Sequence, residues 1–310
     1  MIEDNIYIYT FYRFKNFIEI KSIKIKLDKY LKNRLILGTV LLANEGVNGT
    51  ISGTKKDLNE FIHFIKQTLK IRKLSIKISQ NKFIPFYRLK IRLKKEIVTI
   101  GDKTIKPEKI TGKHIDPKNW DKIINNKKYM IIDTRNKYEV SIGSFKNAIN
   151  PKTKSFREFP KFIEKLNIKK KQPIAMFCTG GIRCEKASSY LLKNGFRDVS
   201  QLDGGILNYL EVKKKDKSIS WQGECFVFDN RVAVNNKLDK GSYEQCYGCR
   251  HPITKKDMKL KSYIKGATCK YCIDKKTNTK IISSIVRQKQ IDLAEIKKIS
   301  HPFKKIYNEK

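Results

Sequence analysis

The chain has 310 residues, of which 40% are hydrophobic, and it contains 16 glycines, 8 prolines and 7 cysteines. This composition excludes collagen-like and low-complexity chains, and the length allows two or three domains with cores of their own. Lysine and arginine total 68 against 30 acidic residues, which gives a formal net charge of +38.

The net charge and the pattern of apolar residues limit which partners the protein can have and where in the cell it can be. The chain does not open on a basic segment followed by an apolar one, and its longest uncharged apolar stretch, residues 35–44, is too short to span a bilayer. We therefore expect a cytoplasmic protein with no membrane partner. A polyanion is the default partner of so basic a chain, because neutralised phosphates release counterions. The alternative is the codon bias of an AT-rich genome, which spreads lysine over every segment.

Residues 1–95 are expected to form a ferredoxin-like α+β domain. The predicted elements are, in chain order, strand 6–14, helix 16–32, strand 35–43, turn 44–49, strand 50–52, helix 54–69 and strand 74–79. Runs of β-branched and aromatic residues indicate the strands, and apolar spacing of three and four residues indicates the helices. The turn is rich in glycine and asparagine, and Thr54 followed by Asp57 is typical of a helix start.

Residues 86–120 are expected to hold a basic strand and then a linker over 96–120. Arg88, Lys90 and Arg92 alternate with apolar residues, so they share one face of that strand. Such a face fits an RNA-binding stripe, and it fits a solvated strand face equally well.

The rest of the chain divides into an α/β domain over 121–215, a cysteine-rich segment over 216–280 and a basic tail over 281–310 with a short helix. In the α/β domain, predicted strands 129–133 and 173–178 alternate with predicted helices 155–166 and 184–194. This alternation indicates a parallel sheet, with a site in the loops at the carboxyl ends of its strands.

The segment from Phe177 to Ala187 gives the most specific indication of a catalytic site. A strand delivers Cys178, a glycine-containing loop follows, and a helix begins near Arg183. Backbone N–H groups at a helix start stabilise an anion, so they lower a thiol pKa and favour the thiolate. Arg183 is expected to close this cradle and to pair with an anionic substrate group. The loop residues between the two are Thr179, Gly180, Gly181 and Ile182.

The number of residues in this loop distinguishes a cysteine phosphatase from a protein that holds a single sulfur atom. Cysteine phosphatases require five residues between the cysteine and the arginine, whereas four residues separate Cys178 from Arg183. The smaller cradle suits a single sulfur atom, as in a persulfide. The alternative is that Cys178 is a buried core residue before a helix, with no catalytic role.

The chain here resembles the rhodanese family. The matching segments are 132–135 (IDTR), Tyr138 with Glu139, Gly143, 148–151 (AINP), the Cys178 loop and 202–205 (LDGG). The resemblance implies that Asp133 and Arg135 support the active loop, with Arg135 able to face substrate. One departure is Ser144, which stands where the family usually has histidine.

A closer resemblance covers about residues 5–275. Residues 42–52 (LANEGVNGTIS), 178–187 (CTGGIRCEKA) and 221–234 (WQGECFVFDNRVAV) are similar to the tRNA uridine(34) hydroxylases, the TrhO family. This resemblance implies an acylphosphatase-like N-terminal domain and a rhodanese domain. It also implies O2-dependent conversion of the wobble uridine, in the tRNA anticodon loop, to 5-hydroxyuridine.

Two routes for Cys178 fit this reaction. The thiolate can add to C6 of uracil and make C5 nucleophilic, or it can carry a persulfide that reacts with O2. Cys184, six residues after Cys178, can resolve an oxidised Cys178 or can be a residue packed under the loop. The sequence shows neither a flavin motif nor an iron triad, so the electron donor stays unknown, as does the oligomeric state.

The second cysteine set is Cys246, Cys249, Cys269 and Cys272. Two C-x2-C pairs at this separation have zinc-ribbon spacing, and four thiolates make a closed structural zinc site. The alternative is four reduced thiols packed without metal.

Two other functions compete with tRNA hydroxylation. A plain sulfurtransferase would move sulfur through a Cys178 persulfide to a thiol or tRNA acceptor, and a binding module would use the cysteine-rich segment without catalysis. The intact Cys178 and Arg183 disfavour the binding module. The basic N-terminal domain disfavours sulfur transfer to a small thiol, which does not need it.

Overall fold

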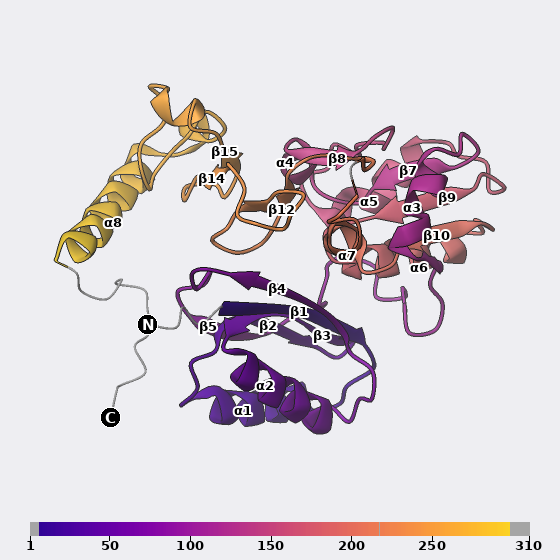
Figure 1. Ribbon diagram of the computed structural model, residues 1–310, viewed down its shortest axis with the longest axis horizontal. Coiled ribbons are helices and arrows are strands. Elements are labelled where there is room, and N and C mark those ends of the chain that lie inside the picture. Colours follow the sequence, from indigo (N-terminus) through magenta and orange to yellow (C-terminus); the bar gives the residue numbers. More distant parts are fainter. Residues whose placement is uncertain (1–5, 217, 298–310) are drawn as a thin grey trace.

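The structure is a computed structural model that describes residues 6–216 and 218–297 (Figure 1). These residues form an N-terminal sheet covered by two helices, a central α/β domain and a C-terminal segment that ends in a long helix. No helix in these ranges is both long enough and apolar enough to cross a membrane.

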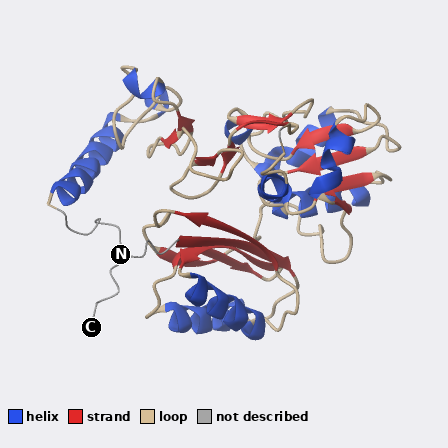
Figure 2. Ribbon diagram, viewed as in Figure 1, coloured by secondary structure: helices blue, strands red, loops and turns tan. Residues whose placement is uncertain are grey.

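The N-terminal domain is one five-stranded sheet with its helices on one face (Figure 2). Its elements are β1 (Ile6–Phe14), α1 (Ile20–Leu31), β2 (Leu37–Ala43), β3 (Gly46–Gly53), α2 (Lys55–Thr68), β4 (Ser75–Asn81) and β5 (Leu89–Leu93). The strand order is β4-β1-β3-β2-β5. The first four strands pair antiparallel in the ferredoxin-like order, which confirms that prediction, and β5 adds to β2 in parallel.

The packing of this domain follows from its strand alternation. Tyr9 and Phe11 of β1 point into the core between the sheet and the helices, where they meet Leu27 of α1 and Phe61 of α2. Successive strand residues point to opposite faces, so Thr10 lies on the face away from the helices. Thr54 caps α2 as expected, because its side chain accepts a hydrogen bond from the Asp57 N–H at 3.1 Å.

The turn predicted over 44–49 is shorter than expected. Only Asn44 and Glu45 form it, and β3 already begins at Gly46. Gly49 lies inside β3, paired with Phe11 of β1, and a Cβ there would approach the Phe11 ring to 2.6 Å. The glycines therefore serve close packing as well as the turn.

The central domain is built on a parallel four-stranded sheet of order β6-β10-β9-β7. Its elements are β6 (Lys113–Ile115), α3 (Pro117–Ile124), β7 (Met130–Asp133), α4 (Lys137–Val140), β8 (Gly143–Phe145), η1 (Phe156–Glu158), α5 (Phe159–Lys165), β9 (Ile174–Phe177), α6 (Ile182–Lys193), β10 (Val199–Leu202) and α7 (Gly205–Val212). The expected parallel sheet is therefore present.

The segment predicted as a linker, residues 96–120, is partly structured. β6 pairs with β10 in the sheet, and α3 begins at Pro117. Ile100 and Ile105 are buried in the core beside α6. The prediction missed these elements because β6 is three residues long and its apolar neighbours lie far along the chain.

The C-terminal segment consists of short strand pairs followed by a helix. Its elements are β11 (Trp221–Gly223), β12 (Cys225–Phe226), β13 (Ala233–Val234), β14 (Glu244–Gln245), β15 (Pro252–Ile253), η2 (Asp257–Lys259), η3 (Ile273–Lys275) and α8 (Asn278–Ile296). The helix expected within 281–310 thus begins earlier and is 19 residues long. Residues 298–310 of the predicted tail lie outside the described residues.

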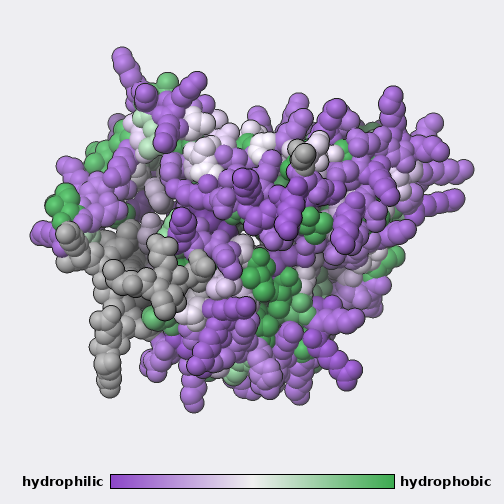
Figure 3. All heavy atoms as spheres, in the orientation of Figure 1, coloured by the Kyte–Doolittle hydropathy of each residue, from purple (hydrophilic) through white to green (hydrophobic). Residues whose placement is uncertain are grey.

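The three parts form one assembly around one face of the N-terminal sheet. We call it the free face, because α1 and α2 leave it uncovered. This face is turned toward α7 and β12, whereas α1 and α2 cover the other face (Figure 1). Hydrophilic side chains cover most of the molecular surface seen in Figure 3, as a charged fraction of 32% leads one to expect.

Candidate active site

The active loop, residues 178–183, joins β9 to α6 between the two domains. β9 is wholly buried between β10 and β7, so it fixes Cys178 at the carboxyl end of the sheet. Gly181 has φ +95° and caps α6, a backbone conformation that a residue with a side chain rarely adopts. The N–H of Gly181 then donates to the Cys178 Sγ at 3.1 Å.

Cys178 has the electrostatic surroundings of a thiolate. Its side chain is 1% exposed, and burial alone would raise its pKa. Hydrogen bonds from the Cys184 thiol and from the N–H groups of Cys184 and Arg183, together with the Arg183 charge, outweigh burial and lower the pKa of Cys178 to about 6. The thiolate is therefore the main form at neutral pH.

Cys184 lies directly beneath the loop. It is wholly buried and its Sγ lies 3.7 Å from the Thr134 hydroxyl. Burial and the hydrogen bond to Cys178 raise the pKa of Cys184 well above its ordinary value. Within this pair Cys178 is thus the thiolate and Cys184 the proton donor.

Arg183 is held by a carboxylate of the protein. Its two terminal nitrogens donate to the Glu139 carboxylate at 2.7 and 2.8 Å, and both side chains are buried. The sequence led us to expect that Arg183 pairs with substrate, whereas the structure engages it with Glu139. Arg183 consequently acts on Cys178 as a fixed positive charge.

Asp133 and Arg135 form a buried ion pair beside Glu139, the partner of Arg183. Arg135 is wholly buried and donates to Asp133 at 2.9 and 2.6 Å, and to the Gly143 carbonyl at 2.6 Å. Ser144 donates its hydroxyl to Asp133 at 2.7 Å. Arg135 is thus surrounded by protein groups; that it supports the active loop or faces substrate stays a prediction.

The N-terminal sheet closes over the loop from the other side. A Cβ at Gly180 would meet only the Thr10 methyl, at 4.0 Å, and a Cβ at Gly181 would meet the Tyr12 hydroxyl at 3.0 Å. Tyr12 donates to Glu185 at 3.0 Å, a contact that spans 173 positions in sequence. β1 is thus part of the wall of the site.

A buried ion cluster joins the same two domains. Lys186 is fully buried and contacts Glu45 at 2.7 Å and Glu96 at 2.6 Å. Glu45 belongs to the 42–52 motif and Lys186 to the 178–187 motif. Two motifs that are distant in sequence therefore meet in one ion pair.

The third motif reaches the loop through the β12–β13 hairpin. The Thr179 hydroxyl lies 3.5 Å from the Phe226 carbonyl, and the Arg183 guanidinium lies 5.9 Å from the centre of the Phe228 ring. The hairpin also contacts the N-terminal domain, since Arg231 donates to Ser79 at 3.3 Å.

The basic residues of β5 lie at the edge of the free sheet face. Cross-strand register places Lys77, Thr10, Thr50, Thr39 and Lys90 in one row across the five strands. Because Thr10 lies on the free face, the whole row lies there, and so does Arg92, two residues after Lys90 in β5. Arg88 directly precedes β5. Arg88 and Arg92 are exposed and Lys90 is half-buried. These cations stand apart from the active loop but share a face with Thr10.

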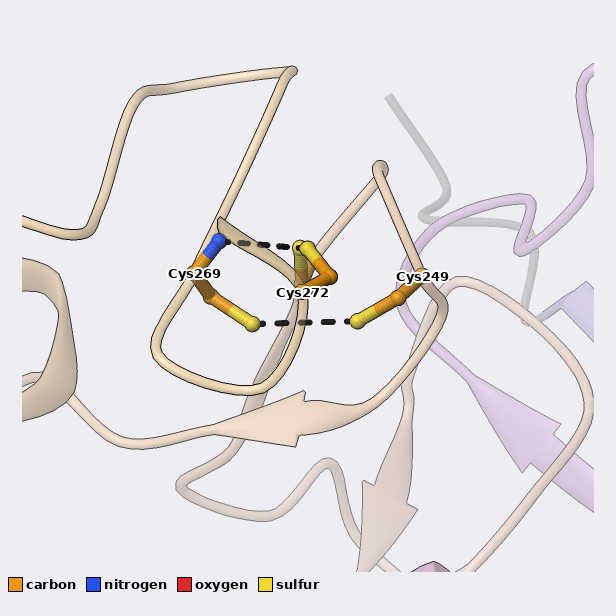
Figure 4. A group of neighbouring side chains, drawn as sticks. Cys249, Cys269 and Cys272 are labelled. Carbon is orange, nitrogen blue, oxygen red and sulfur yellow. Dashed lines mark hydrogen bonds between the residues drawn. The ribbon is translucent and has the colours of Figure 1, made fainter. Parts of the chain in front are cut away.

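The four cysteines of the C-terminal segment come together as predicted. Their sulfur atoms lie within 4.8 Å of one another, so the cluster could hold a metal ion. The Cys246 and Cys272 sulfurs are 3.9 Å apart. The Cys249 and Cys269 sulfurs are 3.7 Å apart (Figure 4).

Sequence reasoning gave no role to several residues of this site. Glu139 stood in a quoted motif without a partner, and Tyr12, Glu45, Lys186 and Phe228 were not singled out. The opposite charges of Glu45 and Lys186, inside two motifs of the same family pattern, were the available signal.

Two family models match the N-terminal and central domains of this chain. Residues 6–97 match the UPF0176 acylphosphatase like domain and residues 116–211 match the Rhodanese-like domain. A rhodanese-related protein from Thermoplasma volcanium is 25% identical over 32% of this chain and 92% of its own, with a TM-score of 0.27. A rhodanese-like domain protein from Staphylococcus aureus is 26% identical over 31% of this chain and 90% of its own, with a TM-score of 0.27.

One relative matches nearly the full length. The tRNA uridine(34) hydroxylase of Pelagibacter ubique (strain HTCC1062) is 48% identical over 299 residues, which cover 96% of this chain and 98% of the relative. Identity at this level along both domains is far more than a shared rhodanese loop requires. The chain therefore belongs to the tRNA uridine(34) hydroxylase family.

Proposed function

We propose that this protein hydroxylates C5 of the wobble uridine, position 34, in tRNA, with Cys178 as the reacting group. The main support is the sequence identity of 48%, over nearly the full length, to a protein named tRNA uridine(34) hydroxylase. A buried thiol whose pKa is lowered to about 6 supports it. Position 34 lies in a single-stranded loop, so the base can enter without opening a duplex.

The reaction balances with O2 as co-substrate. The C5–H bond is replaced by a C5–O bond, the second oxygen atom leaves as water, and a donor supplies two electrons and two protons. The Cys178 thiolate serves either by adding to C6, which makes C5 nucleophilic toward oxygen, or by carrying a persulfide sulfur. The buried Arg183 next to Cys178 stabilises negative charge in both cases.

The test compares wobble nucleosides in cells with and without the protein. Deletion is expected to remove 5-hydroxyuridine, and complementation with Cys178→Ser is expected to leave it absent. Normal 5-hydroxyuridine with Cys178→Ser would refute the catalytic role of Cys178. Loss of a thionucleoside instead would assign the protein to sulfur transfer, the competing function of a rhodanese domain.

We also propose a cytoplasmic location, because the proposed substrate is tRNA, and the same substrate would give part of the positive charge a role. We assign Arg88, Lys90 and Arg92 to contacts with the RNA backbone, because Lys90 and Arg92 share the free sheet face with Thr10 beside the loop and Arg88 directly precedes β5. Neutralising these three residues is expected to weaken tRNA binding and flatten its salt dependence. Three equivalent changes over 169–171 are the control and should do less.

We further propose that the four-cysteine cluster of the C-terminal segment (Cys246, Cys249, Cys269 and Cys272) holds structural zinc. Tetrahedral zinc with Zn–S bonds of about 2.3 Å requires sulfur atoms about 3.8 Å apart. The two distances of 3.9 and 3.7 Å match this requirement.

Metal analysis of freshly reduced, unchelated protein tests the zinc proposal. One zinc per chain is expected, and Cys269→Ser should lose it and unfold the segment at a lower denaturant concentration. Protein that is folded and free of zinc would refute it.

A further inference from the structure

A cavity of about 190 Å³ lies where the three parts of the molecule meet. Its walls come from β1 and β4, from α7, and from β13 with residues on both sides of it. Its polar lining residues are Thr10, Lys77, Ser79, Asn208, Glu211 and Arg231. Thr10 also faces Gly180 of the active loop, so the cavity adjoins the side of the loop that faces the N-terminal sheet.

Lys77 places an ammonium group in this wall. Among the residues that the structure describes, its Nζ has no hydrogen bond and no carboxylate within ion-pair distance. Burial lowers the pKa of Lys77, and the more distant Asp203 carboxylate opposes that shift. A half-buried cation without a partner is costly, and an incoming anion relieves the cost.

The position of Lys77 depends on the glycine pair that supports the active loop. A Cβ at Gly204 would collide with the Lys77 Cε and Nζ, and a Cβ at Gly205 would collide with the Cys178 carbonyl oxygen. The Lys77 ammonium therefore lies against the segment that itself packs on Cys178. An anion held by Lys77 would be close to the reacting base.

Among the described residues that line the cavity, Lys77 is the cation that stays available to a ligand, because the other cation, Arg231, is already paired. Arg231 is engaged by Asp229 at 2.9 and 2.7 Å and by Ser79. Glu211 is exposed, and its carboxylate can accept a hydrogen bond from a ribose hydroxyl. The cavity thus offers one cation and hydrogen-bonding groups beside apolar walls, as a ribose phosphate requires.

We propose that this cavity binds a phosphate of the RNA backbone adjacent to the uridine that reacts, and that Lys77 is its cation. The proposal rests on the proposed tRNA hydroxylation and names a contact of that same substrate. The row from Lys77 to Lys90 supports it, because four strand spacings of about 4.8 Å separate these cations by about 19 Å across the free face. The RNA backbone would then run along this face to the β5 edge.

Binding of an anticodon stem-loop RNA to the full-length protein tests the proposal. Lys77→Met is expected to raise the Kd about tenfold, the effect of losing a charged hydrogen bond, and to reduce the salt slope by about 0.7 to 0.9. Lys56→Met, which removes the same charge on the outer face of α2, is the matched control and should change neither by more than about twofold. Lys77→Arg should bind nearly as the wild type. Equal Kd and salt slope for Lys77→Met and wild type would overturn the proposal.

A second measurement uses the unaltered protein. Acetylation of Lys77, followed by peptide mass spectrometry, should be slowed by the stem-loop RNA, while acetylation of Lys56 should not change. Protection by inorganic phosphate but not by RNA would place a free anion in the cavity and would also overturn the proposal. Neither readout needs turnover, so a wild type that binds RNA but makes no 5-hydroxyuridine would count against the proposed function alone.

Discussion

The buried thiolate at Cys178 should make the stability of the protein depend on pH in a defined way. The pKa of Cys178 falls from 9.0 to about 6 in the folded protein. Because the folded pKa is depressed, the group contributes stability that is fully present above pH 9 and is lost as pH falls to about 6. Three pKa units correspond to about 4 kcal/mol at 1.36 kcal/mol each.

The measurable quantity is the difference in unfolding free energy between wild type and Cys178→Ser. This difference should grow by about 1.4 kcal/mol per pH unit between pH 6 and pH 9, since one proton is released on folding. Urea unfolding followed by tryptophan fluorescence measures it, because Trp120 and Trp221, the two tryptophans of the chain, both lie in the core of the central domain.

Cys225→Ala provides a matched control. Cys225 is a wholly buried thiol whose pKa is raised by burial to about 12. A group with a raised pKa stays protonated in the folded protein below pH 9, so the wild type should show no such growth relative to Cys225→Ala. A difference between wild type and Cys178→Ser that stays constant from pH 6 to pH 9 would refute the thiolate assignment.

Three further predictions follow from contacts of the loop. Glu139→Gln should destabilise the protein by about 3–5 kcal/mol, because it strands a buried guanidinium, whereas Glu244→Gln at an exposed pair should cost under about 1 kcal/mol in urea unfolding. Cys184→Ala removes a donor to Cys178, so half-maximal alkylation by iodoacetamide should move above pH 6, while Cys184→Ser should retain it; overlapping profiles would contradict this. Lys186→Met leaves two carboxylates unpaired between the domains and should separate unfolding into two transitions; a single unchanged transition would disprove the role of this ion cluster.

What the sequence predicted well is local. The strand, the glycines and the helix start around Cys178 lie within ten positions, so their spacing alone indicates an anion cradle. The four-cysteine cluster is likewise encoded by spacing. The strand order of the N-terminal domain followed from the order of its elements, because that order permits few arrangements.

What it did not predict depends on contacts between distant positions. The partner of Arg183 is Glu139, 44 positions away, and a partner of Lys186 is Glu96, 90 positions away. Charge alone does not choose among the many candidates in a chain with 68 basic residues. At Gly49 the local preference of glycine for turns misleads, because this glycine is paired in the sheet and leaves room for the Phe11 ring.

The three family motifs share one physical purpose in this structure, and that purpose separates the hydroxylase interpretation from plain sulfur transfer. A rhodanese loop needs only its own sheet and the Glu139 partner to hold a reactive sulfur. Here the loop is also covered by Tyr12 from β1 and approached by Phe228 from the β12–β13 hairpin. A small thiol acceptor does not need these additional contacts around the loop. A macromolecular substrate needs contacts on several sides of the base that enters the site. The buried Lys186 cluster joins the N-terminal domain to the helix that follows Cys178. We therefore propose that the N-terminal domain contributes to the active site itself and is more than an appended RNA-binding module.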